Sequence, residues 1–582
     1  MRKRDASGRS APSSCPTRPN LLKGLCNPAL SALLLAAALA GCDSGSINPE
    51  PQAGTVSGRV TYDAVPAVPT YLDYAATKQL PVRGAIVEAV SGKDENGQVV
   101  ASGRTDADGG YVLELPPGSD VRIRVQARLL RDGGGKGGSW DVAVRDNTSP
   151  EFLTDPGNTP IYALQSEPLS VPAQGARLDL HAASGWNDRA YTGTRAAAPF
   201  SVLDQTYSAI QRFLDGAPDL DFPPLNVYWS IKNGPAEGKL ADGDIGTSHY
   251  HNENDEDGPI GLYILGKEDV DTDEYDTAIV IHEWGHYFEK QVSRADNIGG
   301  SHALGEKVDM RVAWGEGWGN ALAGVVRDDP VYIDTSGKGQ SGGFTFDVSA
   351  LPDADHDRSW YSEASMQYFI YQLSRIPGGF DATVSVLRNE QKRTPAFTSV
   401  FPFATALGSR LAGSPAIQAD TLLDSLNIPR MAQLDPWGSA VTYTILTEPP
   451  IVSTPYSTVD EQDQELCVTN GYGAEYNKFG QGRSLRLEVP VAGTYRLNAV
   501  RSTSHPFDSH ALLRMTRDGI EIDNEREDDV SFDFALEAGT HTGWLVDSAL
   551  SGLDEDSESP SALTNVCYRV NFEPVTASQG AL

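Results

Sequence analysis

The chain has 582 residues, with 46 Lys and Arg against 79 Asp and Glu and a formal net charge of -33 at pH 7. This excess of acid argues against nucleic acid or an anionic membrane surface as the main partner, and a hydrophobic content of 40% excludes global disorder. The length, together with 57 Gly and 37 Pro that favour turns, predicts several domains rich in β-structure.

Residues 1–41 are predicted to be a signal peptide. A basic leader precedes an apolar run from Pro28 to Ala40 that is too short to span a bilayer, and the chain then reads Leu39-Ala40-Gly41-Cys42. This ending resembles a bacterial lipobox. The resemblance implies a lipid anchor, palmitate included, on Cys42, and a place in the bacterial cell envelope facing the periplasm or the exterior. An ordinary signal peptide with a chance cysteine is the alternative.

A polar, Pro-containing tether at 42–53 leads to a segment of predicted strands. Apolar and polar residues alternate in Val56–Tyr62, and Asp108-Gly109 predicts a hairpin turn within residues 101–113 because glycine tolerates positive φ. This order over residues 54–130 resembles the carboxypeptidase regulatory-like domains. The resemblance implies a small prealbumin-type β-sandwich that acts as a spacer or an adhesive surface.

Residues 131–195 are rich in glycine and then irregular, with strands predicted at Trp140–Val144 and Leu178–Ala182. They either finish the first sandwich or form a second β-rich subdomain or connector. From Pro199 onward apolar residues recur at helical spacing, which begins a mixed α/β to mainly α block that we place at 196–448.

The clearest chemical signal is His282-Glu283-Trp284-Gly285-His286. Positions i and i+4 of a helix point the same way, so His282 and His286 can bind one Zn²⁺, and Glu283 lies where a general base belongs. The preceding apolar run predicts a buried helix, with Asp271, Thr272 or Asp273 as its cap. A buried helix whose histidines bind only backbone groups is the alternative.

A catalytic zinc needs a third protein ligand and one open position. Gly-Glu-Gly-Trp at 315–318 resembles the gluzincin zinc peptidases, and most closely the fungalysin group. The resemblance makes Glu316 the third ligand. Where those families have an acid that steadies the first histidine, this chain has Asn320, whose amide oxygen can still accept an imidazole N–H. Rival third ligands are His302, Glu306 and Asp309.

Gluzincins also supply a Tyr or His that stabilises the oxyanion, and by resemblance Tyr361 and His356 are the candidates. Alternatively, Tyr361 packs in the core and His356 lies in a solvated loop. The segment Gly261–Gly266 is a predicted strand before the zinc helix, and in the resembling families the corresponding edge strand binds the substrate backbone.

Two acidic segments, 253–257 and 269–273, are candidate Ca²⁺ sites. Neither fits the helix–loop–helix calcium motif, and solvated acidic loops are the favoured interpretation.

Residues 449–582 alternate like strands and resemble the β-sandwich appended to many secreted bacterial peptidases. Removal of the signal leaves Cys467 and Cys567 besides Cys42, and an oxidising compartment predicts a disulfide between them that ties the first strand of this sandwich to the last. Two buried free thiols are the alternative.

The sequence thus predicts a multidomain, lipid-anchored zinc metalloendopeptidase of gluzincin type. An N-terminal β-sandwich precedes a zincin-like catalytic domain and a C-terminal β-sandwich. We expect one Zn²⁺ per chain, a protein or peptide substrate and no nucleic acid, and the oligomeric state is left open. Two alternatives remain: an inactive surface binding or adhesion lipoprotein with a peptidase-like domain, and a zinc hydrolase of non-peptide amides or esters.

Overall fold

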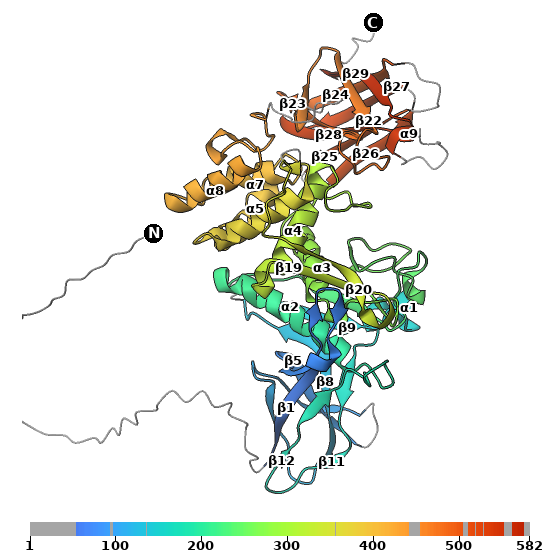
Figure 1. Cartoon of the computed structure of the whole chain (residues 1–582), viewed down its shortest axis with the longest axis vertical. Helices are drawn as coiled ribbons and strands as arrows, with labels where there is room; N and C mark the ends of the chain where they lie inside the picture. Colours follow the sequence, from blue (N-terminus) through green and yellow to red (C-terminus); the bar gives the residue numbers. More distant parts are fainter. Residues whose placement is uncertain are drawn as a thin grey trace, which may run out of the picture. The chain divides into compact units, whose positions relative to one another are not determined.

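The computed structural model describes residues 54–92, 97–135, 137–354, 357–441, 454–503, 510–517, 520–527, 529–551 and 562–575 (Figure 1). The predicted signal peptide, Cys42, the tether and His356 lie outside the described residues. Among the helices that are described, none combines the length and the apolar character that crossing a bilayer requires.

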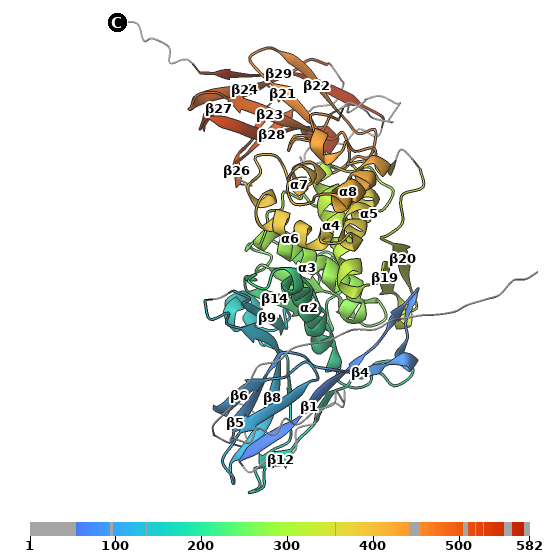
Figure 2. The ribbon, with the colours of Figure 1, turned by 90° about the vertical axis from the view of Figure 1, so that its left-hand side faces the viewer.

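The N-terminal part is a sandwich of two sheets that share an apolar core containing Val60, Val87 and Val125 (Figure 2). One sheet is built around β1 (Thr55–Ala64), which pairs with β4 (Lys78–Pro81), β7 (Gly110–Glu114), β12 (Ala176–Arg177) and β13 (Leu180–Ala182). The other contains β5 (Ala85–Ser91), β6 (Val99–Arg104), β8 (Asp120–Arg131), β10 (Ala163–Gln165) and β11 (Leu169–Ser170). Four short strands from the 131–195 segment therefore complete the first sandwich.

The predicted hairpin at Asp108-Gly109 is wrong. Gly109 does have a positive φ of 80°, but β6 pairs with β5 while β7 pairs with β1, so the turn carries the chain from one sheet to the other. The Asp106 carboxylate accepts hydrogen bonds from the backbone N–H groups of Asp108 and Gly110 (2.9 and 2.7 Å), which bends the chain sharply at this crossover.

The second sheet continues beyond the sandwich. β9 (Trp140–Arg145) pairs with β8 and, on its other side, runs parallel to β14 (Leu225–Trp229). β14 is almost wholly buried, and a strand buried on both faces needs partners along both edges. The boundary expected between residues 195 and 196 therefore does not separate two independent sheets.

The sheet ends with β16 (Gly261–Ile264), parallel to β14, and β15 (His249–His251), antiparallel to β16. The predicted strand at Gly261–Gly266 exists, but it is an inner strand. β15 occupies the edge position that was expected for it, because the polar segment before β16 folds back and pairs with it.

Seven longer helices of the described chain form the next part: α2 (Ala197–Gly216), α3 (Thr277–Gln291), α4 (Met310–Arg327), α5 (Glu363–Arg375), α6 (Gly379–Arg388), α7 (Val400–Leu407) and α8 (Ser414–Ser425). α3 packs between α2 and α4, and α4 packs on α5 (Figure 1). The ring of Phe213 on α2 lies 4.2 Å from that of Phe288 and 5.2 Å from that of Trp284, both on α3. These aromatic contacts hold α3, which carries the His-Glu-x-x-His motif, against α2, and α2 in turn packs on β1, β8 and β9.

α3 begins at Thr277 with Asp276 as its N-cap residue, so Asp271, Thr272 and Asp273 do not cap it. Asp273 instead opens a short 3₁₀ helix, Asp273–Tyr275, that interrupts the chain before α3. A small sheet lies beside the helices, in the order β17 (Gly266–Lys267), β18 (Asp271–Thr272), β19 (Val331–Ser336) and β20 (Gly342–Asp347).

The C-terminal part is a second sandwich. One sheet has the order β21 (Tyr456–Val459), β23 (Gly482–Val489), β28 (Gly539–Asp547), β25 (Ala511–Arg517), β26 (Ile520–Glu527), and the other β22 (Gln464–Thr469), β29 (Asn565–Pro574), β24 (Gly493–Arg501), β27 (Asp529–Leu536). Cys467 and Cys567 form a disulfide with an S–S distance of 2.04 Å. The disulfide links the neighbouring strands β22 and β29, which are the second and the last strands of this sandwich. The prediction that it ties the first strand to the last is wrong, because the first strand, β21, pairs in the opposite sheet.

Candidate metal centre and active site

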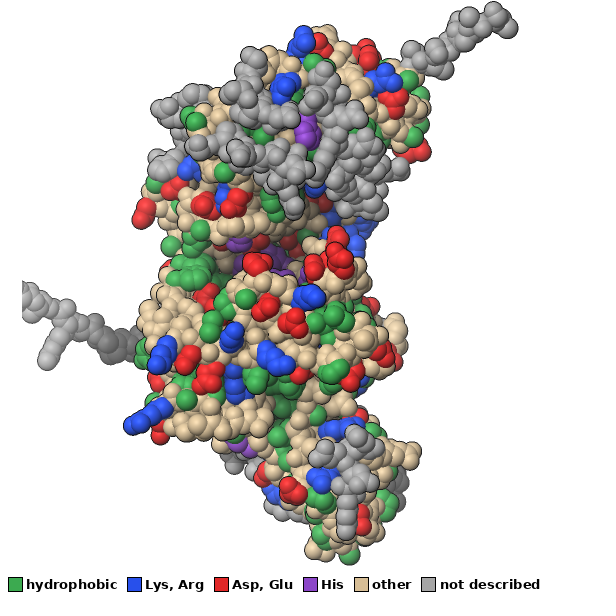
Figure 3. All heavy atoms as spheres, turned by 90° about the vertical axis from the view of Figure 1, so that its right-hand side faces the viewer, with side chains coloured by type: hydrophobic (Ala, Val, Ile, Leu, Met, Phe, Trp, Pro, Cys, Tyr) green, Lys and Arg blue, Asp and Glu red, His purple; other side chains and the backbone are tan. Residues whose placement is uncertain are grey.

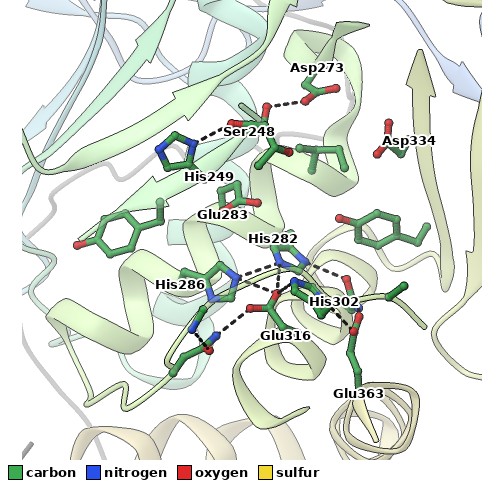
Figure 4. A pocket seen from close by; sticks show the side chains of 18 of the residues that line it. Ser248, His249, Asp273, His282, Glu283, His286, His302, Glu316, Asp334 and Glu363 are labelled. Atoms are coloured by element: carbon green, nitrogen blue, oxygen red, sulfur yellow. Dashed lines mark hydrogen bonds and ion pairs between the residues drawn. The ribbon is translucent and has the colours of Figure 1, made fainter. Parts of the chain in front are cut away.

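A cavity of about 860 Å³ opens where α3, α4 and the strands β15 and β19 meet. His282, Glu283 and His286 of α3 line it, as does Glu316 of α4 (Figure 4). A space-filling view shows histidine side chains inside a hollow of the surface with acidic side chains near its rim (Figure 3). The residues singled out by the sequence motif thus share one solvent-accessible space.

Three side chains converge on a single point. His282 Nε2 lies 3.0 Å from His286 Nε2, and Glu316 Oε2 lies 3.3 Å from the first nitrogen and 3.4 Å from the second. A tetrahedral zinc with bonds of about 2.0–2.1 Å places its ligand atoms about 3.3 Å apart. The donor set of two imidazoles and one carboxylate, at these separations, fits Zn²⁺ and would supply three of its ligands.

Of the rival third ligands, Glu306 and Asp309 lie elsewhere, and His302 contacts Glu316 without belonging to the converging group. No group of converging ligand atoms in the described chain contains His302, Glu306 or Asp309. Glu306 pairs with Lys478 (2.8 Å), and Asp309 caps α4 by accepting a hydrogen bond from the Arg311 backbone N–H.

Glycines bring the two helices close enough for Glu316 to reach the histidines. A Cβ atom on Gly319 would lie 2.8 Å from the His282 ring, and one on Gly285 would lie 3.4 Å from the Gly319 Cα. The Trp318 indole N–H donates to the Gly285 carbonyl (3.0 Å), which locks this contact. The Gly- and Trp-rich sequence of α4 therefore sets the distance between α3 and α4.

Asn320 orients the first histidine. Its Oδ1 lies 2.9 Å from His282 Nδ1 and accepts that N–H, which leaves the Nε2 lone pair pointing at the metal position. The Asn320 amide then donates to Glu363 Oε1 (2.6 Å) and to Gln367 Oε1 (3.1 Å), both on α5. A carboxylate is thus connected to His282 through the amide.

Sequence reasoning missed Glu363 and Gln367, because nothing local places α5 behind the metal ligands. It also missed Asn297, whose amide donates to Glu316 Oε1 (2.8 Å) and holds the ligand carboxylate in place. The only local signal for this loop residue was its position between the histidine motif and Glu316.

His302 bridges two carboxylates. Its Nε2 lies 3.2 Å from Glu316 Oε2 and its Nδ1 lies 3.0 Å from Glu363 Oε2. Burial lowers the pKa of His302, but the hydrogen bonds to these carboxylates outweigh it and raise the pKa to about 11. Both ring N–H groups are therefore engaged, and His302 acts on the site by holding Glu316.

The metal ligands also form a charged cluster. Burial disfavours the charged form of His286, but the Glu316 carboxylate raises its pKa to about 9. Burial likewise acts against the Glu316 carboxylate, yet His286 and the neighbouring histidines hold its pKa well below the usual range. Since zinc binds neutral imidazole, metal binding at this cluster would release protons and would weaken as the pH falls.

Tyr361, the expected oxyanion donor, does not line the cavity. Its side chain is 1% exposed and packs against the rings of Trp360 and Phe479, the second at 4.6 Å. The prediction is wrong because Phe479, from the C-terminal part of the chain, closes an aromatic cluster over this segment. His356 cannot be placed, as it lies outside the described residues.

Tyr332 of β19 lines the cavity instead. Its ring lies 6.1 Å from the His282 ring, and burial together with the charge of Glu283 raises its pKa well above the usual value. Tyr332 therefore carries a neutral hydroxyl in the cavity that Glu283 and the candidate metal ligands also line. No local pattern predicted Tyr332, because β19 reaches the site only through its pairing in the small sheet.

In comparison with protein families, residues 247–394 match the mycolysin C-terminal domain. This part of the chain is related to a metallopeptidase family. The matched residues contain α3, α4, β19 and α5, and with them every side chain of the metal centre described above. No curated protein matches the chain.

Solved structures give weaker likenesses. The precursor of protealysin, a metalloproteinase from Serratia proteamaculans, is 9% identical, with a TM-score of 0.26 over 40% of this chain and 77% of that one. The pre-peptidase C-terminal domain of collagenase from Bacillus anthracis is 5% identical, with a TM-score of 0.14 over 20% of this chain and 97% of that one. Neither TM-score supports a shared fold.

A second cluster in the cavity is purely acidic. Carboxylate oxygens of Asp271, Asp273 and Asp334 all lie within 4.8 Å of one another. Burial raises the pKa of Asp271 to about 6 and that of Asp334 to about 7, and it raises that of Asp273 well above the usual range. The 253–257 segment is different, since all five of its residues are exposed and Asp255 accepts hydrogen bonds from its own loop.

Proposed function

We propose that this protein is a zinc-dependent metallopeptidase of gluzincin type that hydrolyses peptide bonds outside the cytoplasm. The observation that carries the proposal is the convergence of His282, His286 and Glu316 beside Glu283 in one open cavity. The family match over residues 247–394 and the resemblance to the gluzincins support a peptide substrate. His282, His286 and Glu316 would hold one Zn²⁺ per chain.

When bound, zinc would polarise the scissile carbonyl and acidify a water molecule. Glu283 takes the proton of the attacking water and later returns it to the leaving amine. The Tyr332 hydroxyl donates a hydrogen bond to the oxygen on which negative charge develops. Asn320, Asn297 and His302 keep the ligand side chains in one orientation through this cycle.

The edge strand β15 is the proposed binding surface for the substrate backbone. It is the last strand of its sheet, and His249 and Tyr250 on it line the cavity. An extended peptide can add to such a free edge through main-chain hydrogen bonds. A peptide added there would lie along the cavity that Tyr332 also lines.

We also propose that the mature chain is anchored by lipid on Cys42 in the cell envelope. The lipobox-like sequence supports the anchor, and the Cys467–Cys567 disulfide supports an oxidising compartment. Membrane fractionation of a Cys42→Ala variant tests this, since an unchanged membrane fraction would contradict the anchor.

The peptidase proposal is tested by Glu283→Gln. The variant should retain about one zinc per chain, while kcat/KM on a peptide substrate falls by about 10²–10⁴-fold, since only the proton acceptor is lost. The matched control is Glu289→Gln on the same helix. Burial raises the pKa of Glu289 to about 8, its side chain faces Trp314 and not the cavity, and its replacement should leave the activity intact.

Wild-type protein separates the alternatives. A folded chain that binds no zinc and cleaves no peptide would favour an inactive binding or adhesion lipoprotein. A zinc-loaded chain that cleaves amides or esters but no peptide would favour the non-peptide hydrolase. Either result overturns the proposed peptidase function.

A further inference from the structure

We propose that Asp271, Asp273 and Asp334 form a second metal site, which binds Ca²⁺ and is separate from the His282–His286–Glu316 cluster. The site goes beyond the proposed peptidase function and does not depend on it. In Figure 4, Asp273 and Asp334 lie on the side of the cavity away from Glu316.

The spacing of the oxygens fits one cation. Three carboxylate oxygens, one from each residue, lie within 4.8 Å of one another. Calcium binds oxygen at about 2.3–2.6 Å, so opposite ligands of one ion lie up to about 5 Å apart. The set contains oxygen donors alone, which suits a hard cation, whereas the imidazoles of the other cluster suit zinc.

Unsatisfied buried oxygens point to a ligand. The Asp273 side chain is nearly inaccessible, with 3% of the residue exposed, and its Oδ1 has no hydrogen-bond partner. Its Oδ2 accepts a hydrogen bond from the Ser248 hydroxyl, and Asp271 Oδ1 is likewise buried without a partner. Buried polar atoms without partners are rare and costly, so a group that satisfies them is expected.

The charge of the cluster is also uncompensated by the chain. No Lys or Arg of the described residues forms an ion pair with Asp271, Asp273 or Asp334. Three carboxyl groups that face one another cannot all ionise without repulsion, and a divalent cation favours their charged forms. The sequence had favoured a solvated acidic loop at 269–273; burial of Asp273 and the arrival of Asp334 from β19 change that interpretation.

The elements that carry the ligands give the site a structural role. Asp271 lies on β18, Asp273 opens the 3₁₀ helix that leads into α3, and Asp334 lies on β19, the strand that follows α4. A bound ion would therefore tie the start of the helix with His282 to the segment after the helix with Glu316. Water from the cavity can complete its coordination.

Terbium luminescence tests binding directly. The purified protein, dialysed against calcium-free buffer that contains zinc, is titrated with Tb³⁺ under excitation of its aromatic residues; Tyr332 lies two residues from Asp334. We expect a saturable signal that Ca²⁺ displaces. Asp273→Asn and Asp334→Asn should weaken Tb³⁺ binding at least tenfold, whereas Asp255→Asn, in the other acidic segment, should leave it unchanged.

Thermal unfolding adds a second test, because a bound Ca²⁺ should raise the Tm of the wild type and not that of a ligand variant. Ca²⁺ at a hundredfold excess over its Kd should raise the Tm of the wild type by roughly 2–3 °C and leave that of Asp334→Asn unchanged. In calcium-free buffer Asp334→Asn should be as stable as the wild type or more so, because it removes one of three buried groups that cannot all ionise without repulsion.

Two results would overturn the calcium site: no Tb³⁺ or Ca²⁺ effect on the wild type, or an effect that persists in Asp273→Asn and Asp334→Asn. A third is a calcium-independent protein in which Asp334→Asn abolishes a preference for Lys or Arg in peptide substrates. That result would make the cluster a subsite for a basic side chain.

Discussion

Asn320 stands where the gluzincin pattern has an acid, and its amide links His282 to the Glu363 carboxylate. The resembling peptidases have an acid at this position, and an uncharged amide alone would make His282 a weaker ligand. Here the Asn320 amide oxygen accepts a hydrogen bond from His282, and the amide N–H donates one to the Glu363 carboxylate at 2.6 Å. The carboxylate therefore polarises the amide that holds His282. The negative charge behind His282 is thus carried by Glu363 on α5, and not by a residue of α4.

Replacing Asn320 by the acid of the family pattern should therefore weaken the site. In Asn320→Asp the new carboxylate would face Glu363 Oε1 where the amide N–H now donates, and zinc affinity should fall by about 10–100-fold. The double variant Asn320→Asp/Glu363→Gln should recover much of it, because Gln can donate to the new carboxylate. Zinc titration decides the outcome, and a single variant that binds as tightly as the wild type would contradict this account.

Two tyrosines near the candidate active site differ in whether they line the cavity. Tyr332 lines the cavity beside Glu283, whereas Tyr361 is buried under Phe479. Tyr332→Phe should lower kcat by about 10²–10³-fold with little change in KM and in zinc content, because the lost hydrogen bond acts only as charge develops. Tyr361→Phe is the control and should retain kcat. Equal activities of the two variants would remove Tyr332 from the mechanism.

At the scale of elements, the contact between α3 and α4 determines whether a third ligand exists. Glu316 reaches the histidines only because Gly319 and Gly285 allow the two helices to touch. The same helices are held from outside by Phe213 of α2 and by α5. The metal centre is thus a property of a helix pair and not of the histidine motif alone.

Gly319→Ala tests this directly. The added Cβ would lie 2.8 Å from the His282 ring, so either the ring rotates or the helices separate. We expect a loss of about 1–3 kcal/mol in the free energy of unfolding, together with weaker zinc binding. Gly157→Ala, where the nearest atom lies at 3.9 Å, should change neither. Thermal unfolding and zinc titration measure both quantities, and unchanged zinc binding in Gly319→Ala would argue against the role of the contact.

For the whole molecule, the long sheet sets how far the part of the chain around the candidate active site extends. β14 is paired with β9 from Leu225 to Tyr228, and Arg145 donates to the Asn226 side chain at 2.7 Å. The C-terminal sandwich also contacts the helices, where Lys478 pairs with Glu306 and Phe479 covers Tyr361. Neither flanking sandwich is a detachable module.

A chain that begins at residue 196 should consequently fail to fold. It would expose the full edge of β14, a buried apolar strand, and such an edge promotes aggregation. A chain that begins at residue 54 keeps β9 and should be soluble and unfold cooperatively. Expression, size-exclusion chromatography and thermal unfolding compare the two. A soluble, zinc-binding protein from the shorter chain would show that the parts are independent.

The sequence alone was enough to predict features that depend on residues a few positions apart. The interval between His282 and His286 puts both rings on one face of any helix, and the Gly-Glu-Gly-Trp segment identified Glu316 by resemblance. Alternating residues likewise predicted many of the strands in both sandwiches. These features follow from the period of the local backbone, which holds wherever the element lies.

Only the tertiary structure decided which distant groups meet in the cavity. Tyr332 rather than Tyr361, Glu363 behind Asn320, β15 rather than β16 at the sheet edge, and Asp334 beside Asp273 all depend on pairings between remote segments. No local period encodes such pairings, because they are set by how complete elements pack and bury their apolar faces. The strongly acidic composition argued against nucleic acid and anionic membrane surfaces as partners. Only the fold showed that Asp271, Asp273 and Asp334 lie close together.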